Sequence, residues 1–133
     1  TFFCCVEAGK VMIEQKKGKI INIASAGGLV ALPRLSAYSS SKGGVIQVTR
    51  ALAVDWAPYN IQVNAIAPGW VATEFTQGLR DNESIYNELA GRTPAKRFGQ
   101  PDEMVGAALY FASEASNYTT GAVLAIDGGL TAW

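Results

Sequence analysis

The sequence alternates segments of helical apolar spacing with short apolar runs, and this alternation constrains its fold more than any other feature. Apolar residues recur at helical spacing in segments at about 1–17, 37–57, 75–80, 83–91 and 101–113. Shorter runs, rich in β-branched residues and typical of strands buried on both faces of a parallel sheet, lie at 19–24, 61–67 and 122–126. This order predicts βαβ units, and therefore an α/β fold with helices on both faces of a parallel sheet.

Local signals set the expected ends of these elements. The Lys-Lys-Gly segment 16–18 ends the first helix. Ser36 is expected to be the N-cap of the long helix, which Pro58 ends. Pro101 is expected in the first turn of the last long helix, where its missing N–H costs nothing.

Composition excludes several classes of chemistry. The chain has 11 basic and 11 acidic residues and no histidine, so a Ser-His-Asp triad and a His-based metal site are impossible within it. Cys4 and Cys5 are adjacent, and we interpret them as two buried thiols in a reducing compartment, not as metal ligands. The sequence has no basic cluster, so no nucleic acid is expected as a partner, and the residue types above make a metal unexpected. It also has no signal peptide and no apolar run of ~18 residues, so no membrane is expected as a partner and a cytoplasmic location is predicted.

Three polar residues can serve proton transfer at a carbinol oxygen. Tyr38 and Lys42 are four apart on a predicted helix, so their side chains lie on one face. Ser25 follows a predicted strand, at the sheet edge where open α/β sheets build their sites. A nearby ammonium favours the phenolate of a tyrosine, and a serine hydroxyl can stabilise charge on a substrate oxygen. Taken alone, a Tyr-x-x-x-Lys pair is more often a surface contact.

The motifs around these residues settle the interpretation by their order and spacing. They are the run 18–25, then Tyr38 and Lys42, the strand and turn 60–69, and the segment 121–129 that ends in Asp-Gly-Gly. Together they resemble the short-chain dehydrogenase/reductase family, from its fourth helix to its C-terminus. The resemblance implies that residues 1–133 are the C-terminal half of a Rossmann-type doubly wound parallel sheet.

The resemblance also implies the roles of individual residues. Ser25, Tyr38 and Lys42 would be catalytic: Ser25 as donor to the substrate oxygen, Tyr38 as acid–base, and Lys42 as ribose ligand and partner of Tyr38. With Tyr38 and Lys42, the further cofactor-binding residues would be Pro68, Gly69, Val71 and Thr73. The cofactor would be NAD or NADP, and the substrate an alcohol or ketone. Asn64 and Asp127 are interpreted as structural.

The family's glycine-rich phosphate loop has no counterpart in the sequence. Gly27-Gly28 and Gly43-Gly44 have the wrong spacing for a Gly-x-Gly-x-x-Gly motif. The sequence also opens inside an apolar helical pattern, and three strands are few for a doubly wound sheet. We therefore expect a single NAD(P)-binding domain whose N-terminal phosphate-binding half is absent, so that these 133 residues alone are inactive.

Alternative functions remain open at this point. The segment 39–42 matches the Ser-x-x-Lys of β-lactam-binding enzymes, but its partner motifs are missing, and Ala-Ser-Ala-Gly at 24–27 lacks the first glycine of a nucleophile elbow. A catalytically inactive or binding protein of the same fold is the second alternative. Among family members, the turns at 97–101 and 127–130 look most like the gluconate 5-dehydrogenase group, which acts on sugar acids, with 3-oxoacyl-acyl-carrier-protein reductases as the alternative.

Two further expectations concern substrate and assembly. Arg80, Arg92 and Arg97 could meet a substrate carboxylate. The family usually forms homotetramers through its two long helices and its last helix and strand. Apolar residues occupy several faces of the predicted helix 37–57, which fits a buried or intersubunit position: Val45, Ile46, Val48, Leu52, Val54 and Trp56.

Overall fold

Three parallel strands form the sheet in the computed structural model, which describes residues 1–132. They are β1 (Gly18–Ile23), β2 (Ile61–Pro68) and β3 (Val123–Ile126), in the spatial order β1-β2-β3. Near the carboxyl ends, Ile23 pairs with Ile66, and the Ala24 N–H continues the ladder to the Ile66 carbonyl at 2.8 Å. The predicted parallel sheet is confirmed, with β2 at its centre.

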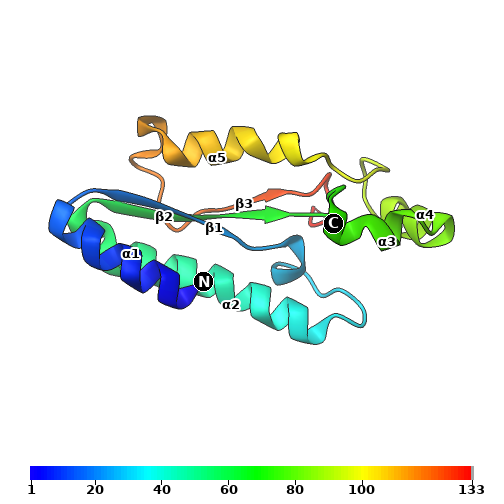
Figure 1. The fold of residues 1–133 in the computed structure, drawn as a ribbon, viewed down its shortest axis with the longest axis horizontal. Helices are drawn as coiled ribbons and strands as arrows, with labels where there is room; N and C mark the ends of the chain where they lie inside the picture. The colour runs from blue at the N-terminus through cyan, green and yellow to red at the C-terminus, as the bar shows by residue number, and fades with distance from the viewer. Residues whose placement is uncertain (133) are drawn as a thin grey trace.

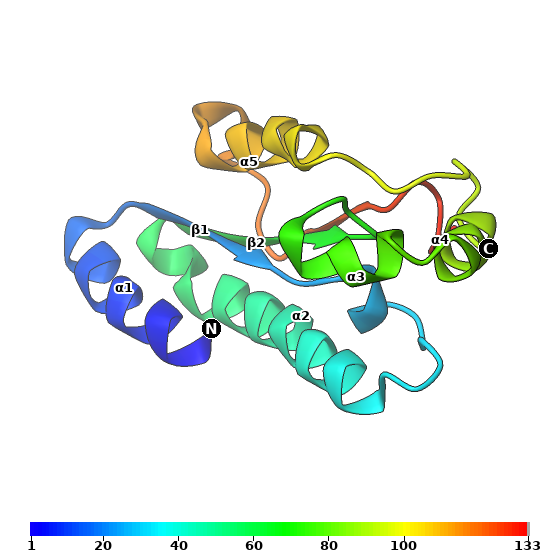
Figure 2. The same cartoon turned by 45° about the vertical axis from the view of Figure 1, so that its right-hand side comes forward.

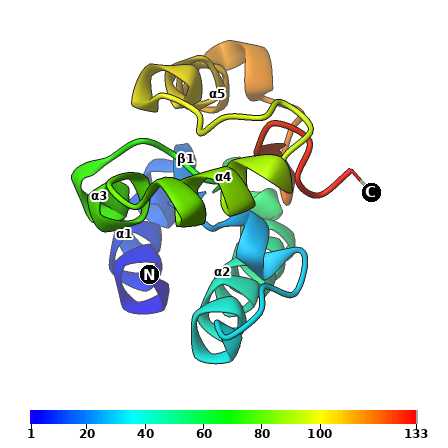
Figure 3. The same cartoon turned by 90° about the vertical axis from the view of Figure 1, so that its right-hand side faces the viewer.

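Helices cover both faces of this sheet, as the alternation predicts. The long helices α1 (Phe2–Gln15) and α2 (Ser36–Trp56) lie on one face, and α5 (Val105–Ala112) lies on the other (Figure 1). The short helices α3 (Gln77–Arg80) and α4 (Glu83–Gly91) lie beyond the carboxyl ends of the strands (Figures 2 and 3). Short 3₁₀ helices connect these elements: η1 (Ala26–Gly28), η2 (Ala57–Tyr59), η3 (Glu74–Thr76), η4 (Pro101–Met104) and η5 (Glu114–Ser116). Among residues 1–132, none of the helices combines the length and apolar character that a membrane crossing requires.

The central strand carries most of the buried surface of the sheet. Every residue from 61 to 67 is buried, as predicted for a strand covered on both faces. The same prediction is wrong for the other two strands, since only Asn22 of β1 is buried and no residue of β3 is. Both strands have a neighbour on one side only, so less of their surface is covered.

Apolar side chains pack the sheet against both helical layers. On the α1–α2 face, Leu52 packs with Ile61 and Val63 of β2. On the other face, Phe111 of α5 packs with Ile66 and is 2% exposed. Removing a buried phenylalanine side chain lowers the free energy of unfolding by about 3–5 kcal/mol, so the packing of Phe111 contributes much to the docking of α5 on the sheet.

A buried polar network ties α1, β1 and α2 together. The Asn22 amide donates to Thr49 Oγ1 at 3.0 Å and accepts from Cys5 Sγ at 3.4 Å. Thr49 Oγ1 in turn donates to the Val45 carbonyl at 2.8 Å. Because buried polar groups without partners are costly, this network permits few alternative placements of α2 on β1.

The structure corrects two local predictions. Ser36 is not the N-cap: Leu35 occupies that position, with no side-chain capping bond, and its carbonyl accepts the Ser39 N–H at 2.8 Å. A turn closed by the Leu35 N–H on the Leu32 carbonyl starts the helix one residue earlier than the serine suggests. The prediction of two buried thiols is half wrong, because Cys5 faces the sheet and is buried while Cys4 is exposed. Pro101, by contrast, lies in the first turn of its helix as predicted.

Candidate active site

Ser25 lies just beyond the carboxyl end of β1 and begins η1. Its backbone is extended, and its Oγ accepts the N–H of Gly27 at 3.0 Å. The side chain is nearly buried. Since the hydroxyl serves as acceptor in this bond, its own proton is free to be donated to a ligand. This is the capacity that the predicted role of Ser25 requires.

Tyr38 and Lys42 lie in the first two turns of α2, on the side that meets the end of β1. The Lys42 Nζ is 5.9 Å from the centroid of the Tyr38 ring. It also donates to the Ile23 carbonyl at 3.1 Å. The ammonium is thus held between the tyrosine and the last residue of β1. The positive charge of Lys42 is thereby held beside the Tyr38 ring.

Two glycines of η1 bring Ser25 close to α2. A Cβ on Gly27 would lie 3.4 Å from Tyr38 Cε1 and 3.5 Å from Ser25 Oγ. A Cβ on Gly28 would lie only 2.7 Å from the backbone carbon of Lys42. The backbone of η1 therefore packs directly against the turn of α2 that carries the tyrosine and the lysine. The sequence places these glycines between Ser25 and Tyr38, but their spacing is interpreted only as unsuited to a phosphate motif, so this packing role is not predicted.

The second group of predicted residues follows β2, the strand next to β1. The Gly69 N–H donates to the Ile126 carbonyl at 3.0 Å, and a Cβ at this position would lie 2.7 Å from Asp127 Cα. Only glycine permits this approach to the end of β3. Pro68, at the end of β2, is aligned with Ile126. The structure thus brings Pro68 and Gly69 to the same sheet edge as Ser25.

Val71 and Thr73 continue from this edge toward α3. Val71 forms an isolated parallel bridge with Gly99, and its carbonyl accepts from Thr76 Oγ1 at 2.6 Å. Within residues 1–132, the N–H of Val71 donates to no protein acceptor. Thr73 starts η3 in a reciprocal capping arrangement with Thr76. A main-chain donor without a protein acceptor among residues 1–132 therefore lies beside the Pro68–Gly69 turn.

The two residues interpreted as structural do have structural roles. The buried Asn64 side chain donates to the Thr119 carbonyl at 2.7 Å and accepts the Ala122 N–H at 3.0 Å. Asp127 accepts from Thr131 and from the Gly129 N–H. Burial alone would raise the pKa of Asp127, but these hydrogen bonds outweigh it and lower the pKa. Both side chains fix loops that flank β3.

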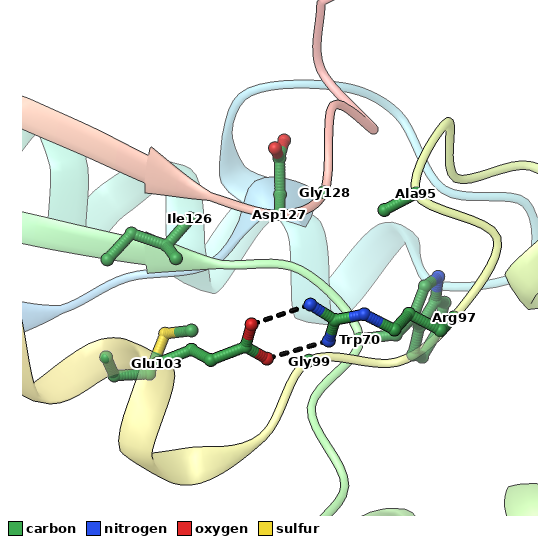
Figure 4. A pocket seen from close by; sticks show the side chains of 9 residues that line it. Trp70, Ala95, Arg97, Gly99, Glu103, Ile126, Asp127 and Gly128 are labelled. Carbon is green, nitrogen blue, oxygen red and sulfur yellow. Dashed lines mark hydrogen bonds and ion pairs between the residues drawn. The ribbon is translucent and has the colours of Figure 1, made fainter.

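A bidentate ion pair closes the turn between α4 and α5. The Arg97 guanidinium contacts both carboxylate oxygens of Glu103, at 2.8 and 2.6 Å, in a small cavity of about 70 Å³ beside Asp127 (Figure 4). Glu103 also accepts the Gln100 N–H at 2.6 Å. The bond from Arg97, followed by that from Gln100, lowers the pKa of Glu103 to about 2, and Glu103 raises the pKa of Arg97. The bidentate geometry identifies this pair as structural.

The fold and this edge of the sheet define an α/β protein of the Rossmann type, and comparison with known proteins identifies the family. A family model described as enoyl-(acyl carrier protein) reductase matches residues 1–131. The chain belongs to the short-chain dehydrogenase/reductase family, as its motifs predict.

Its relatives include enzymes of sugar and sugar-acid metabolism. The galactitol 2-dehydrogenase (L-tagatose-forming) of Cereibacter sphaeroides is 46% identical over 127 residues, which are 94% of this chain and 50% of that protein. The gluconate 5-dehydrogenase of Gluconobacter oxydans is 42% identical over 130 residues, 98% of this chain and 51% of that protein.

A crystal structure of a gluconate 5-dehydrogenase from Burkholderia cenocepacia, in complex with NADP and tartrate, superimposes with a TM-score of 0.94 at 42% identity. The match covers 97% of this chain and 51% of that one. The chain thus spans about half the length of the relatives it matches.

Proposed function

We propose that this chain carries the catalytic residues of an NAD(P)-dependent oxidoreductase that acts on a secondary alcohol or ketone, with a sugar acid or polyol as substrate. One observation carries the proposal: Ser25, Tyr38 and Lys42 converge at the carboxyl edge of the sheet, with the Lys42 ammonium between Tyr38 and Ile23. The relatives named above support the substrate class.

Each residue has a distinct role in the proposed reaction. Ser25 donates a hydrogen bond to the substrate oxygen and stabilises charge that develops on it. In the oxidative direction Tyr38 takes the hydroxyl proton, and in the reductive direction it returns a proton to the carbonyl oxygen. Lys42 stabilises the phenolate by its charge. The nicotinamide, when bound, supplies the hydride acceptor or donor.

The described residues fit the nicotinamide end of the coenzyme. Lys42 and Tyr38 would hold its ribose, and the segment Pro68 to Thr73, with the free N–H of Val71, would hold its ring. No Gly-x-Gly-x-x-Gly segment is present to bind the pyrophosphate. We therefore assign residues 1–133 to the C-terminal part of one dinucleotide-binding domain and expect them to be inactive alone. NADP in the complex from Burkholderia cenocepacia supports NAD or NADP as the coenzyme.

A 3-oxoacyl-acyl-carrier-protein reductase is the second candidate. The description of the matching family model, which refers to an acyl-carrier-protein reductase, favours it. A sugar acid and an acyl thioester differ in charge and in apolar length, so a direct comparison of turnover separates the two.

We propose that the intact protein acts in the cytoplasm as a homotetramer. Large apolar side chains are exposed on both helical layers, among them Phe3 of α1 at 81%, Val54 of α2 at 76% and Leu109 of α5 at 65%. Surfaces of this kind are typical of protein interfaces. Light scattering on the intact protein tests this assembly, and a monomeric mass would refute it.

The decisive experiment is the change Tyr38→Phe in the intact protein. NAD(P)H formation or consumption is measured with gluconate, galactitol and a 3-oxoacyl thioester. Loss of at least about 100-fold in kcat is expected, because acid–base catalysis contributes about 10²–10⁴ in rate. Turnover that survives this change would refute the mechanism. If the folded wild-type protein binds coenzyme but turns over none of the three substrates, the binding-protein alternative is favoured.

A further inference from the structure

A second, larger cavity lies between the α3–α4 segment and the turn before α5. Its volume is about 350 Å³. Its walls are formed by two arginines, two aromatic residues, one alanine and one glutamine: Ala72, Arg80, Tyr86, Arg97, Phe98 and Gln100. No acidic residue belongs to this lining, so the cavity is positively charged.

The charge in this cavity comes from Arg80. Glu103 neutralises Arg97 through the bidentate ion pair, and Arg92, on α4, pairs with Glu88 at 2.7 Å. Within residues 1–132 no carboxylate lies within ion-pair distance of Arg80. Of the three arginines that could meet an anion, Arg80 is therefore the one with no acidic partner in the described chain.

The hydrogen bonds of Arg80 are made to neutral acceptors. One Nη2 bond reaches the Thr73 carbonyl at 3.1 Å, and another reaches the Gln77 side chain. Gln77 itself donates to Asp81 at 2.6 Å, so that carboxylate is engaged elsewhere. The Nε of Arg80 is buried and has no partner among the described residues. A guanidinium that is partly withdrawn from water without a counter-charge is costly unless a ligand supplies that charge.

Aromatic side chains shield one wall of the cavity. Phe98 is buried, and its ring lies 5.0 Å from that of Tyr86 and 5.9 Å from that of Trp70, with which it stacks. This wall keeps water away and lowers the local dielectric constant, which strengthens the attraction between the guanidinium and an anion. It also places a tryptophan in contact with the lining.

We propose that this cavity binds an oxyanion, a carboxylate or a phosphate, and that Arg80 is the residue that recognises it. A planar guanidinium matches the geometry of both groups. Two sources fit the proposed function, on which this inference rests: the carboxylate of a sugar acid and the phosphates of the coenzyme. Arg80 also donates a hydrogen bond to the Thr73 carbonyl, so the cavity adjoins the segment from Pro68 to Thr73 that is assigned to the coenzyme.

The stacking of Trp70 on Phe98 provides a direct test that needs no turnover. Tryptophan fluorescence of the intact protein is titrated with gluconate, with inorganic pyrophosphate, and with galactitol as the neutral counterpart of gluconate. Saturable binding of gluconate assigns the site to the substrate carboxylate, and saturable binding of pyrophosphate alone assigns it to the coenzyme. Either result supports the site, while a Trp70→Phe variant should lose the signal.

Arg80→Gln should weaken the anion affinity at least tenfold, whereas Arg80→Lys should retain part of it. Arg92→Gln is the matched control, because it removes a charge of the same kind that is already paired with Glu88 on α4. Circular dichroism establishes that each variant is folded.

The proposal is overturned if galactitol binds as well as the anions, if no anion saturates, or if Arg80→Gln binds like the wild type. Because the assay measures binding alone, it separates this inference from the proposed catalysis. Anion binding that depends on Arg80 would stand even if Tyr38→Phe left turnover intact.

Discussion

Lys42 donates a hydrogen bond from Nζ to the main-chain oxygen of Ile23, at 3.1 Å, and this contact joins the second turn of α2 to the last residue of β1. Ser25 follows two residues later, so the same contact fixes the distance between the strand that precedes the serine and the helix that carries Tyr38. The lysine is therefore both a charge beside the tyrosine and a link between two elements.

Lys42→Met tests these two roles together. The change keeps an unbranched side chain, shorter by the ammonium group, and removes its charge and its bond to Ile23. We expect kcat of the intact protein to fall about 10²-fold or more, because the charge beside Tyr38 and the link between α2 and β1 are both lost. A kcat equal to that of the wild type would contradict this role.

Gly28→Ala should destabilise the site from within. The new Cβ would lie 2.7 Å from the Lys42 backbone, so η1 and α2 must move apart, at a cost of about 1–3 kcal/mol. Gly44→Ala, in α2, is the control: its Cβ meets nothing within 4 Å, and removing a helical glycine should stabilise by up to about 1 kcal/mol. Urea unfolding of both variants measures the difference, and equal midpoints would refute the packing argument.

Thr49→Val should break the buried network under the site. It removes the acceptor of the Asn22 amide at nearly constant volume and leaves that donor unsatisfied, which costs about 1–3 kcal/mol. Thr49→Ser keeps the hydroxyl and should restore most of the hydrogen bonding. Chemical denaturation compares the two variants. If valine and serine were equally stable, the hydrogen bond would have no measurable role.

Acid should weaken the turn before α5 through Glu103. Its pKa is lowered from the ordinary 4.5 to about 2, so the folded state favours the ionised carboxylate. The resulting stability is fully present above pH about 4.5 and is lost as the pH falls toward 2. The melting temperatures of the wild type and of Glu103→Gln should therefore converge as the pH falls across this range. Melting curves that stay equally far apart at all pH values would contradict the assignment.

Much of the fold follows from local patterns in the sequence. The run 61–67 is predicted to be a strand buried on both faces and Pro101 to lie in a first helical turn, and the structure confirms both, because these features depend on side-chain polarity and backbone chemistry. The spacing of Tyr38 and Lys42 likewise predicts their common face on α2, which the structure confirms. The order of the elements predicts the parallel sheet.

Other features depend on contacts between segments far apart in the sequence. The start of α2 at Ser36 is set by the turn at residues 32–35 and not by a capping side chain. The exposure of Cys4 depends on which side of α1 packs against the sheet. The partial burial of β1 depends on its position at the edge of the sheet. Among three arginines that look alike in sequence, pairing of Arg92 with Glu88 and of Arg97 with Glu103 leaves Arg80 as the one without an acidic partner among residues 1–132.

The sequence by itself determined the family, the α/β class and the identity of Ser25, Tyr38 and Lys42 as the candidate site, because these rest on residue types at fixed spacing. Only the tertiary structure decided how the three come together. The backbone of Gly28 lies against Lys42, and the ammonium of Lys42 reaches Ile23. Such contacts depend on the packing of η1 and β1 against α2, and close packing is a property of the folded chain that no local pattern encodes.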